Sequence, residues 1–102
     1  IAHITGGGIT ENLPRVLPKT CQAKINPNAW TMPPVMQFIQ KVGGISDTEM
    51  RRVFNCGIGL IMVVPKDHAA DTCHRITTLG EAAWVIGEID KRPDGEPGVC
   101  YV

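Results

Sequence analysis

Three consecutive glycines near the start of the chain, Gly6 to Gly8, stand between a histidine and an asparagine in the segment AHITGGGITENLPR. Glycines let a backbone approach a ligand closely, and the free N–H groups of a following helical turn attract anions. The segment therefore indicates a phosphate site, in front of a helix that begins near Thr10. A plain strand-to-helix turn with positive φ angles explains the pattern about equally well. The entropic cost of three successive glycines favours a functional role slightly.

The spacing of the glycines matches neither known phosphate-binding motif of this kind. It is not G-x-G-x-x-G, and no Lys-Ser or Lys-Thr pair follows, as a P-loop requires. The glycine run alone therefore identifies no nucleotide class.

Polar side chains flank the glycines on both sides. His3 could hydrogen-bond a ligand or exchange a proton near neutral pH, although a purely structural histidine fits as well. Asn12 and Arg15 follow on the predicted helix. Arg15 could supply charge to a phosphate, but solvation of the helix surface is the favoured interpretation.

The four cysteines, Cys21, Cys56, Cys73 and Cys100, lie far apart and form no C-x-x-C pair. A chain of 102 residues with 43% hydrophobic residues needs no disulfides for its core, so we expect reduced thiols. Cys56 is expected to be a buried, inert thiol rather than a nucleophile. The neighbouring histidines of Cys73 do not have the usual spacing of zinc ligands, so no metal site is predicted.

The elements that must position these residues alternate between strand and helix. Hydrophobic periodicity predicts a single domain over residues 1–102, of class α/β (α+β), with a mixed β-sheet covered by helices. The runs 58–65 and 82–90 are continuously apolar, which predicts strands buried on both faces. The other predicted strands are 1–4, 21–25 and 99–102, and the predicted helices are 9–18, 33–44, 46–57 and 66–80.

Capping residues support the helix boundaries. Thr10 and Asp67 are predicted N-caps, and Ser46 with Glu49 forms a capping box. Gly43 and Gly80 are predicted to end the second and fourth helices.

Composition excludes several classes of partner. Ten basic and ten acidic residues give no net charge, so neither nucleic acid nor a membrane surface is indicated. No apolar run reaches the roughly 18 residues of a membrane span. The chain begins with Ile1 rather than Met, and we expect it to be one part of a longer cytoplasmic protein.

Four blocks of sequence occur together and in order: AHITGGGITENLPRVLP, W-x-x-P-x-V-M-Q-F-I-Q from Trp30, EMRRVFNCGIGLIMVVP and AWVIGEI. Together they resemble the C-terminal half of the phosphoribosylformylglycinamidine cyclo-ligase family, also called aminoimidazole ribonucleotide synthetases. The resemblance extends from Ile1 to about Ile89, and no function is assigned to residues 91–102.

The resemblance implies a step of purine biosynthesis. Formylglycinamidine ribonucleotide and ATP give aminoimidazole ribonucleotide, ADP and phosphate, with Mg²⁺ assisting. It also implies that this chain is the C-terminal lobe of a two-domain, homodimeric enzyme and is inactive alone. The missing N-terminal domain would supply most ATP and magnesium contacts.

The resemblance further implies a role for residues around the glycines. His3 is the expected catalytic residue, and Thr5, Gly6, Gly7 and Gly8 are expected to hold the substrate's phosphate or its reacting end. Asn12 is a weaker candidate for the same contact. Two alternatives stay open: a stand-alone phosphate- or nucleotide-binding module, and a structural lobe of a related amidotransferase or selenophosphate synthetase type of enzyme.

Overall fold

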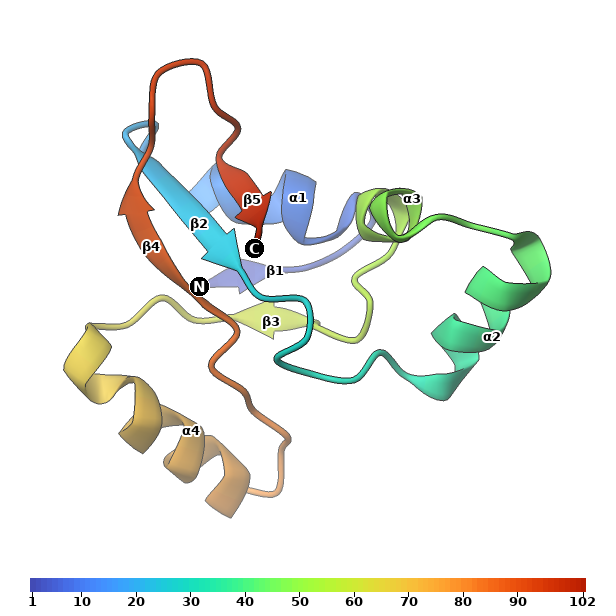
Figure 1. The fold of residues 1–102 in the computed structure, drawn as a ribbon. Coiled ribbons are helices and arrows are strands. Elements are labelled where there is room, and N and C mark those ends of the chain that lie inside the picture. The colour runs from blue at the N-terminus through green and yellow to red at the C-terminus, as the bar shows by residue number, and fades with distance from the viewer.

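The computed structural model describes residues 1–102 and contains strands and helices in the predicted order (Figure 1). This confirms the α/β class. The strands are β1 (Ala2–His3), β2 (Cys21–Ile25), β3 (Leu60–Ile61), β4 (Gly87–Lys91) and β5 (Val99–Tyr101). The helices are α1 (Gly8–Asn12), α2 (Pro34–Gly43), α3 (Asp47–Val53) and α4 (Ala69–Thr78), with short 3₁₀ helices η1 (Leu13–Val16) and η2 (Lys66–His68).

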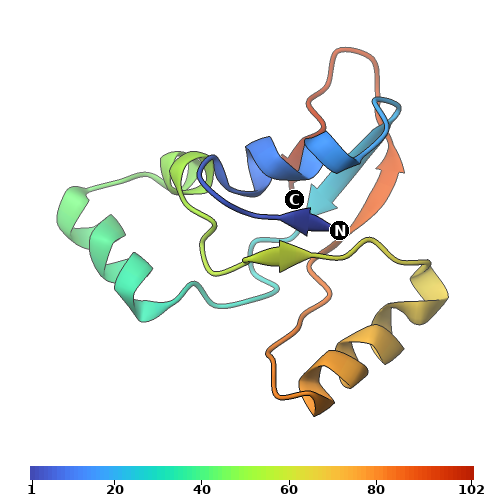
Figure 2. The ribbon, with the colours of Figure 1, turned by 180° about the vertical axis from the view of Figure 1, so that it is seen from behind.

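The strands form two small sheets rather than one. β1 and β3 pair antiparallel, with Ala2 opposite Ile61, and Figure 2 shows them side by side. In the second sheet β2 lies between β4, which is antiparallel to it, and β5, which is parallel to it. The second sheet is therefore mixed, as predicted, but the strands are divided between two sheets instead of forming one.

The core lies where the two sheets meet α1 and η1. Alternation along β2 sends the side chains of Ala23 and Ile25 inward, while Lys24 faces outward and pairs with Asp90 at 2.8 Å. Nine buried apolar residues make up this core: Ala2, Ile4, Ile9, Leu13, Ala23, Ile25, Ile58, Ile61 and Val99.

The first helix is shorter than predicted, and its cap is different. It begins at Gly8 with Gly7 as N-cap, so the prediction that Thr10 caps the helix is wrong. Thr10 lies inside the helix, where its hydroxyl hydrogen-bonds the Tyr101 hydroxyl at 2.9 Å. The α-helix ends at Asn12 and continues as a 3₁₀ turn, because Pro14 has no N–H for an α-helical bond.

The two middle helices begin within one residue of their predicted starts, but α3 ends at Val53, four residues before the predicted end at residue 57. α2 spans Pro34–Gly43, within the predicted range 33–44, and its left-handed C-cap is Gly44 rather than the predicted stop Gly43. The Ser46 hydroxyl of α3 accepts the Glu49 N–H at 3.2 Å, as a capping box requires. The Glu49 carboxylate pairs with Arg52 instead of returning to Ser46, so only half of the box forms.

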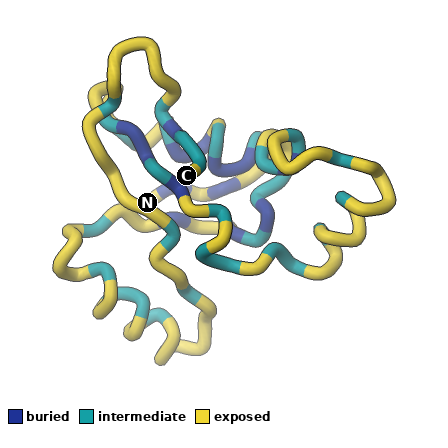
Figure 3. The backbone as a smooth tube through the Cα atoms, viewed as in Figure 1, coloured by how far each residue is buried: buried dark blue, intermediate teal, exposed yellow.

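The two long apolar runs are not strands buried on both faces, so that prediction is wrong. Only Leu60 and Ile61 of the run 58–65 form a strand, and Leu60, Met62 and Val63 are exposed. In the second run the strand begins only at Gly87, and every residue of β4 is exposed. The reason is that β3 and β4 are edge strands, each paired on one side only. Figure 3 shows how much of the backbone of the molecule is exposed.

α4 follows the run 58–65 and lies at the surface, where one face is half-buried and the remaining residues are exposed. It contains no buried residue. Asp67 lies in η2, and Pro65 and His68 occupy the N-cap positions, so the prediction that Asp67 caps this helix is wrong. None of the helices combines the length and the apolar character that a membrane span requires.

Candidate functional site at the glycine loop

We use the name glycine loop for residues 5–8, which connect β1 to α1 (Figure 2). Alternation along the strand buries Ala2 and Ile4 and leaves His3 and Thr5 exposed. Because successive side chains of an extended chain point to opposite faces, His3 and Thr5 lie on the same outward face. The structure therefore brings these two predicted site residues together at the start of the loop.

Two of the three glycine amides are used inside the protein. The Gly7 N–H donates to the Val53 carbonyl at 3.4 Å, and the Gly8 N–H donates to the Thr5 carbonyl at 3.0 Å. The Gly7 and Gly8 amides are therefore not free to hold a phosphate, contrary to the expectation for the backbone of Gly6 to Gly8. The Gly7 amide is used because the loop packs on the C-terminal end of α3, where helical carbonyls have no donor within the helix, and the Gly8 amide is used because the loop turns back on Thr5.

The same packing explains why two of these residues are glycine. Gly7 and Gly8 have left-handed φ angles of +95° and +63°. A Cβ at Gly8 would also collide with the carbonyl oxygens of Arg51 and Phe54. Gly6 differs, because its φ angle is not left-handed and no atom lies within 4 Å of where its Cβ would be. Nothing inside the chain therefore requires glycine at position 6.

Asn12 is buried beneath the loop, with 5% of its surface exposed. Its side-chain Nδ2 donates to the carbonyls of Thr5, Gly6 and Gly8 at 3.3, 3.2 and 2.8 Å. Its Oδ1 accepts the Thr5 hydroxyl at 3.3 Å. Both ends of the amide are engaged inside the protein, so the geometry does not support the prediction that Asn12 contacts a phosphate directly.

Arg15 lies at the loop, although the favoured interpretation of its sequence was solvation of the helix surface rather than charge for a phosphate. Its Nη1 donates to Asn12 Oδ1 at 3.4 Å, and its side chain is exposed. The Thr5 hydroxyl donates to the same oxygen, so the guanidinium and the hydroxyl lie beside each other. The signal in the sequence was the spacing of Arg15 three residues after Asn12, which places both on one helical face.

None of the other reactive side chains forms a second centre. All four cysteines are free, and no group of three or more His, Cys, Asp or Glu residues is arranged to hold a metal. Cys56 is buried, its thiol donates to the Met50 carbonyl at 3.5 Å, and burial raises its pKa. A raised pKa keeps the thiol neutral, which fits the predicted inert role.

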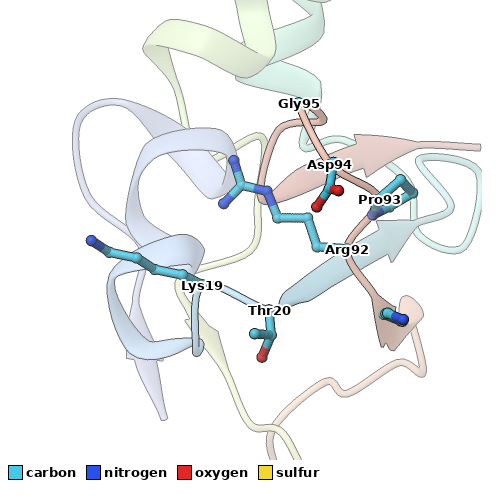
Figure 4. A pocket seen from close by; sticks show the side chains of 7 residues that line it. Lys19, Thr20, Arg92, Pro93, Asp94 and Gly95 are labelled. Atoms are coloured by element: carbon cyan, nitrogen blue, oxygen red, sulfur yellow. The ribbon is translucent and has the colours of Figure 1, made fainter.

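A polar hollow of about 290 Å³ lies elsewhere, between the turn before β2 and the turn after β4 (Figure 4). Lys19, Lys91 and Arg92 contribute positive charge to it, and Asp94 contributes negative charge. It contains none of the predicted site residues. Arg92 is already bonded through its guanidinium Nε to the Glu96 carbonyl.

Comparison with known proteins decides the family. The family model described as "AIR synthase related protein, C-terminal domain" matches residues 1–100. The chain belongs to this family. The match reaches beyond Ile89, so the resemblance extends almost to the end of the chain and reaches into β5.

Individual relatives agree with the family model. The chain is 49% identical over all 102 residues to a protein of Cupriavidus pinatubonensis named phosphoribosylformylglycinamidine cyclo-ligase. It is 50% identical over 102 residues to the protein of the same name from Cupriavidus necator, and 47% identical to that of Citrifermentans bemidjiense. In each case the chain spans 29% of the relative's length.

Proposed function

We propose that this chain is the C-terminal part of a phosphoribosylformylglycinamidine cyclo-ligase, a cytoplasmic ATP-dependent enzyme of purine biosynthesis. The observation that carries the proposal is the identity of about half of all residues, without restriction to one motif, to relatives of that name. A stand-alone binding module is not favoured, because the matched relatives are more than three times as long.

In the proposed reaction ATP converts the formyl oxygen of formylglycinamidine ribonucleotide into a phosphoryl leaving group. An amidine nitrogen then attacks that carbon and closes the five-membered ring, releasing phosphate. Such a reaction depends mainly on positioning and on neutralisation of phosphate charge. The glycine loop would serve the ribonucleotide phosphate or its reacting end.

The loop and the residues that flank it offer several exposed groups of suitable chemistry. These are the imidazole of His3, the hydroxyl of Thr5, the amide of Gly6 and the guanidinium of Arg15. Guanidinium and backbone N–H groups are strong partners of phosphate oxygens. We assign binding to Thr5, Gly6 and Arg15, and proton transfer or orientation of the reacting end to His3.

We assign the magnesium ligands and most contacts to ATP to the rest of the enzyme. The chain contains no cluster of three or more acidic, histidine or cysteine side chains that fits a divalent cation. No step of the reaction is therefore assigned to a metal held by these residues.

The surface of the chain supports the proposal that more polypeptide covers it. Its accessible surface is 6868 Å², whereas a folded monomer of 11.1 kDa exposes about 5,700 Å². The apolar face of α2 contributes to this excess, with Val35, Phe38 and Val42 each more than 60% exposed. We assign this face to contact with the N-terminal domain or with the partner of a homodimer.

A hybrid enzyme tests the function directly. The 102 residues replace the aligned segment of the Cupriavidus pinatubonensis relative, and formation of ADP and of the ring-closed product is measured. We expect turnover that requires both ATP and formylglycinamidine ribonucleotide. A folded hybrid without turnover, beside an active unmodified relative, would count against the proposal.

A further inference from the structure

We propose that Asn12 is a positioning residue that fixes the glycine loop so that the Gly6 N–H points out of the protein. The effect on the loop stands on geometry alone, whereas its effect on catalysis rests on the proposed function. This role differs from direct phosphate contact, because the Asn12 side chain is buried and engaged.

The peptide unit between Thr5 and Gly6 carries the argument. Its carbonyl, the Thr5 oxygen, accepts hydrogen bonds from Asn12 Nδ2 at 3.3 Å and from the Gly8 N–H at 3.0 Å. Both donors belong to buried residues, Asn12 and Gly8, and so lie on the inner side of the loop. The chain contains no cis peptide bond, and in a planar trans peptide the N–H points opposite to the carbonyl. The Gly6 N–H is therefore directed outward, toward solvent.

The next peptide unit is held on both sides. The Gly6 carbonyl has no backbone donor, and Asn12 Nδ2 bonds it at 3.2 Å. The N–H of the same unit, which belongs to Gly7, donates to the Val53 carbonyl. Asn12 thus supplies the one side-chain bond that fixes this plane, while α3 fixes its other edge.

Asn12 also connects the side chains that would share a ligand with this amide. Its Oδ1 accepts from the Thr5 hydroxyl and from Arg15 Nη1, and thereby holds the two donors beside each other. One buried amide therefore sets both the backbone and the polar side chains of the loop. Preorganised donors of this kind avoid the entropic cost of ordering them on binding.

The substitution Asn12→Asp tests this role with little change in shape. A carboxylate has no N–H donors, and it faces the same three carbonyl oxygens, so the loop should loosen. Asn12→Ser is a second variant, because its short hydroxyl cannot span three carbonyls. Gln22→Glu is the matched control: Gln22 is the other buried polar residue, is 4% exposed, and bonds the Pro97 carbonyl away from the loop.

Two readouts are made on the hybrid enzyme. The first is hydrogen–deuterium exchange of the peptide that contains Gly7 and Gly8, without ligand. We expect exchange at least ten times faster in the Asn12 variants and unchanged exchange in Gln22→Glu. Unchanged exchange in folded Asn12 variants would overturn the proposal.

The second readout separates the loop from general destabilisation. The Asn12 variants are compared with Gln22→Glu at temperatures where both have lost the same amount of thermal stability. The Asn12 variants should raise KM for formylglycinamidine ribonucleotide about tenfold or more, whereas KM for ATP should stay within about threefold of the unsubstituted hybrid. Gln22→Glu should leave both KM values within that range. Faster exchange with unchanged KM supports the role of Asn12 in the loop and rejects contact of the loop with substrate. An inactive unsubstituted hybrid rejects the proposed function, and exchange still decides the role of Asn12.

Discussion

At the scale of single residues, His3 is the exposed imidazole that precedes the glycine loop. We expect His3→Ala in the hybrid enzyme to lower kcat by about 10²-fold, the lower range for loss of a general acid or base. Stability should change by less than about 0.5 kcal/mol, because the side chain is exposed. The measurements are steady-state kinetics and thermal unfolding.

His74→Ala is the control for this prediction, since His74 is an exposed histidine on α4, away from the loop. It should keep normal turnover. Normal turnover in His3→Ala as well would remove His3 from the site.

The thiol of Cys56 predicts how stability depends on pH. Burial raises its pKa, so the folded state holds the thiol proton more tightly than the unfolded state. The buried, neutral thiol therefore stabilises the folded state. This contribution is complete below the pKa of an unfolded thiol, about 8.5, and is lost as the pH rises from there through the pKa of the folded state. We expect the temperature midpoint of unfolding to decrease as the pH is raised above about 8.5. The decrease should be less steep in Cys56→Ser.

Tyr101 shares this alkaline behaviour and serves as a check. Burial raises the pKa of its hydroxyl too, so some loss of stability persists at still higher pH in Cys56→Ser. Equal slopes for Cys56→Ser and the parent protein between about pH 8.5 and 10 would contradict the assignment to Cys56.

At the scale of elements, the glycine loop contains two glycines required by the fold and one that is not. Gly8→Ala places a Cβ against the carbonyls of Arg51 and Phe54 at a left-handed φ, and should destabilise by about 2–4 kcal/mol. Gly6→Ala meets no atom and should change stability by less than about 0.5 kcal/mol. Denaturant unfolding of the hybrid enzyme measures both.

Steady-state kinetics then compare substrate binding in these glycine variants. Gly6→Ala should nevertheless weaken binding of formylglycinamidine ribonucleotide, because a methyl group is added on the exposed side of the loop. If Gly6→Ala unfolds as readily as Gly8→Ala, or binds substrate normally, then the claim that the fold requires Gly8 and the substrate requires Gly6 is wrong.

The elements that the sequence predicted well are those governed by neighbouring residues. The bounds of β2 and α2 and the start of α3 are predicted well, since proline and glycine mark the ends of α2 and serine marks the start of α3. The end of α3 is predicted four residues too late. The run 58–65 could not be predicted, because burial of an apolar strand depends on elements that must cover it.

The candidate site shows the same limit. Residue types and spacing pointed to the glycine loop, but the bonding of the Gly7 amide depends on Val53, far along the chain. The inward direction of Asn12 depends on carbonyls that only the folded loop brings together. The three-residue spacing between Asn12 and Arg15 could, however, have favoured Arg15 as a site residue.

At the scale of the whole molecule, α2 and α4 project from the body on different sides (Figure 1), and neither contains a buried residue. The apolar face of α2 has the i, i+3, i+4, i+7 spacing of a helix packed against a partner: Val35, Phe38, Ile39 and Val42. We therefore expect this face to be covered in the hybrid enzyme.

Thiol labelling measures the coverage. Phe38→Cys should react with a maleimide at least ten times more slowly than Gln37→Cys, which lies on the opposite side of the helix. Peptide mapping separates these positions from the native cysteines. Protection that disappears on dilution would assign the face to a second copy, and equal rates at every concentration would show that nothing covers it.

The most direct measurement is the exchange rate of the Gly6 amide in the hybrid enzyme, with and without saturating formylglycinamidine ribonucleotide. An outward N–H that binds the substrate should exchange fast in the free enzyme and become protected by at least tenfold in the complex. Fast exchange that the bound substrate leaves unchanged would contradict the claim that the glycine loop faces the substrate.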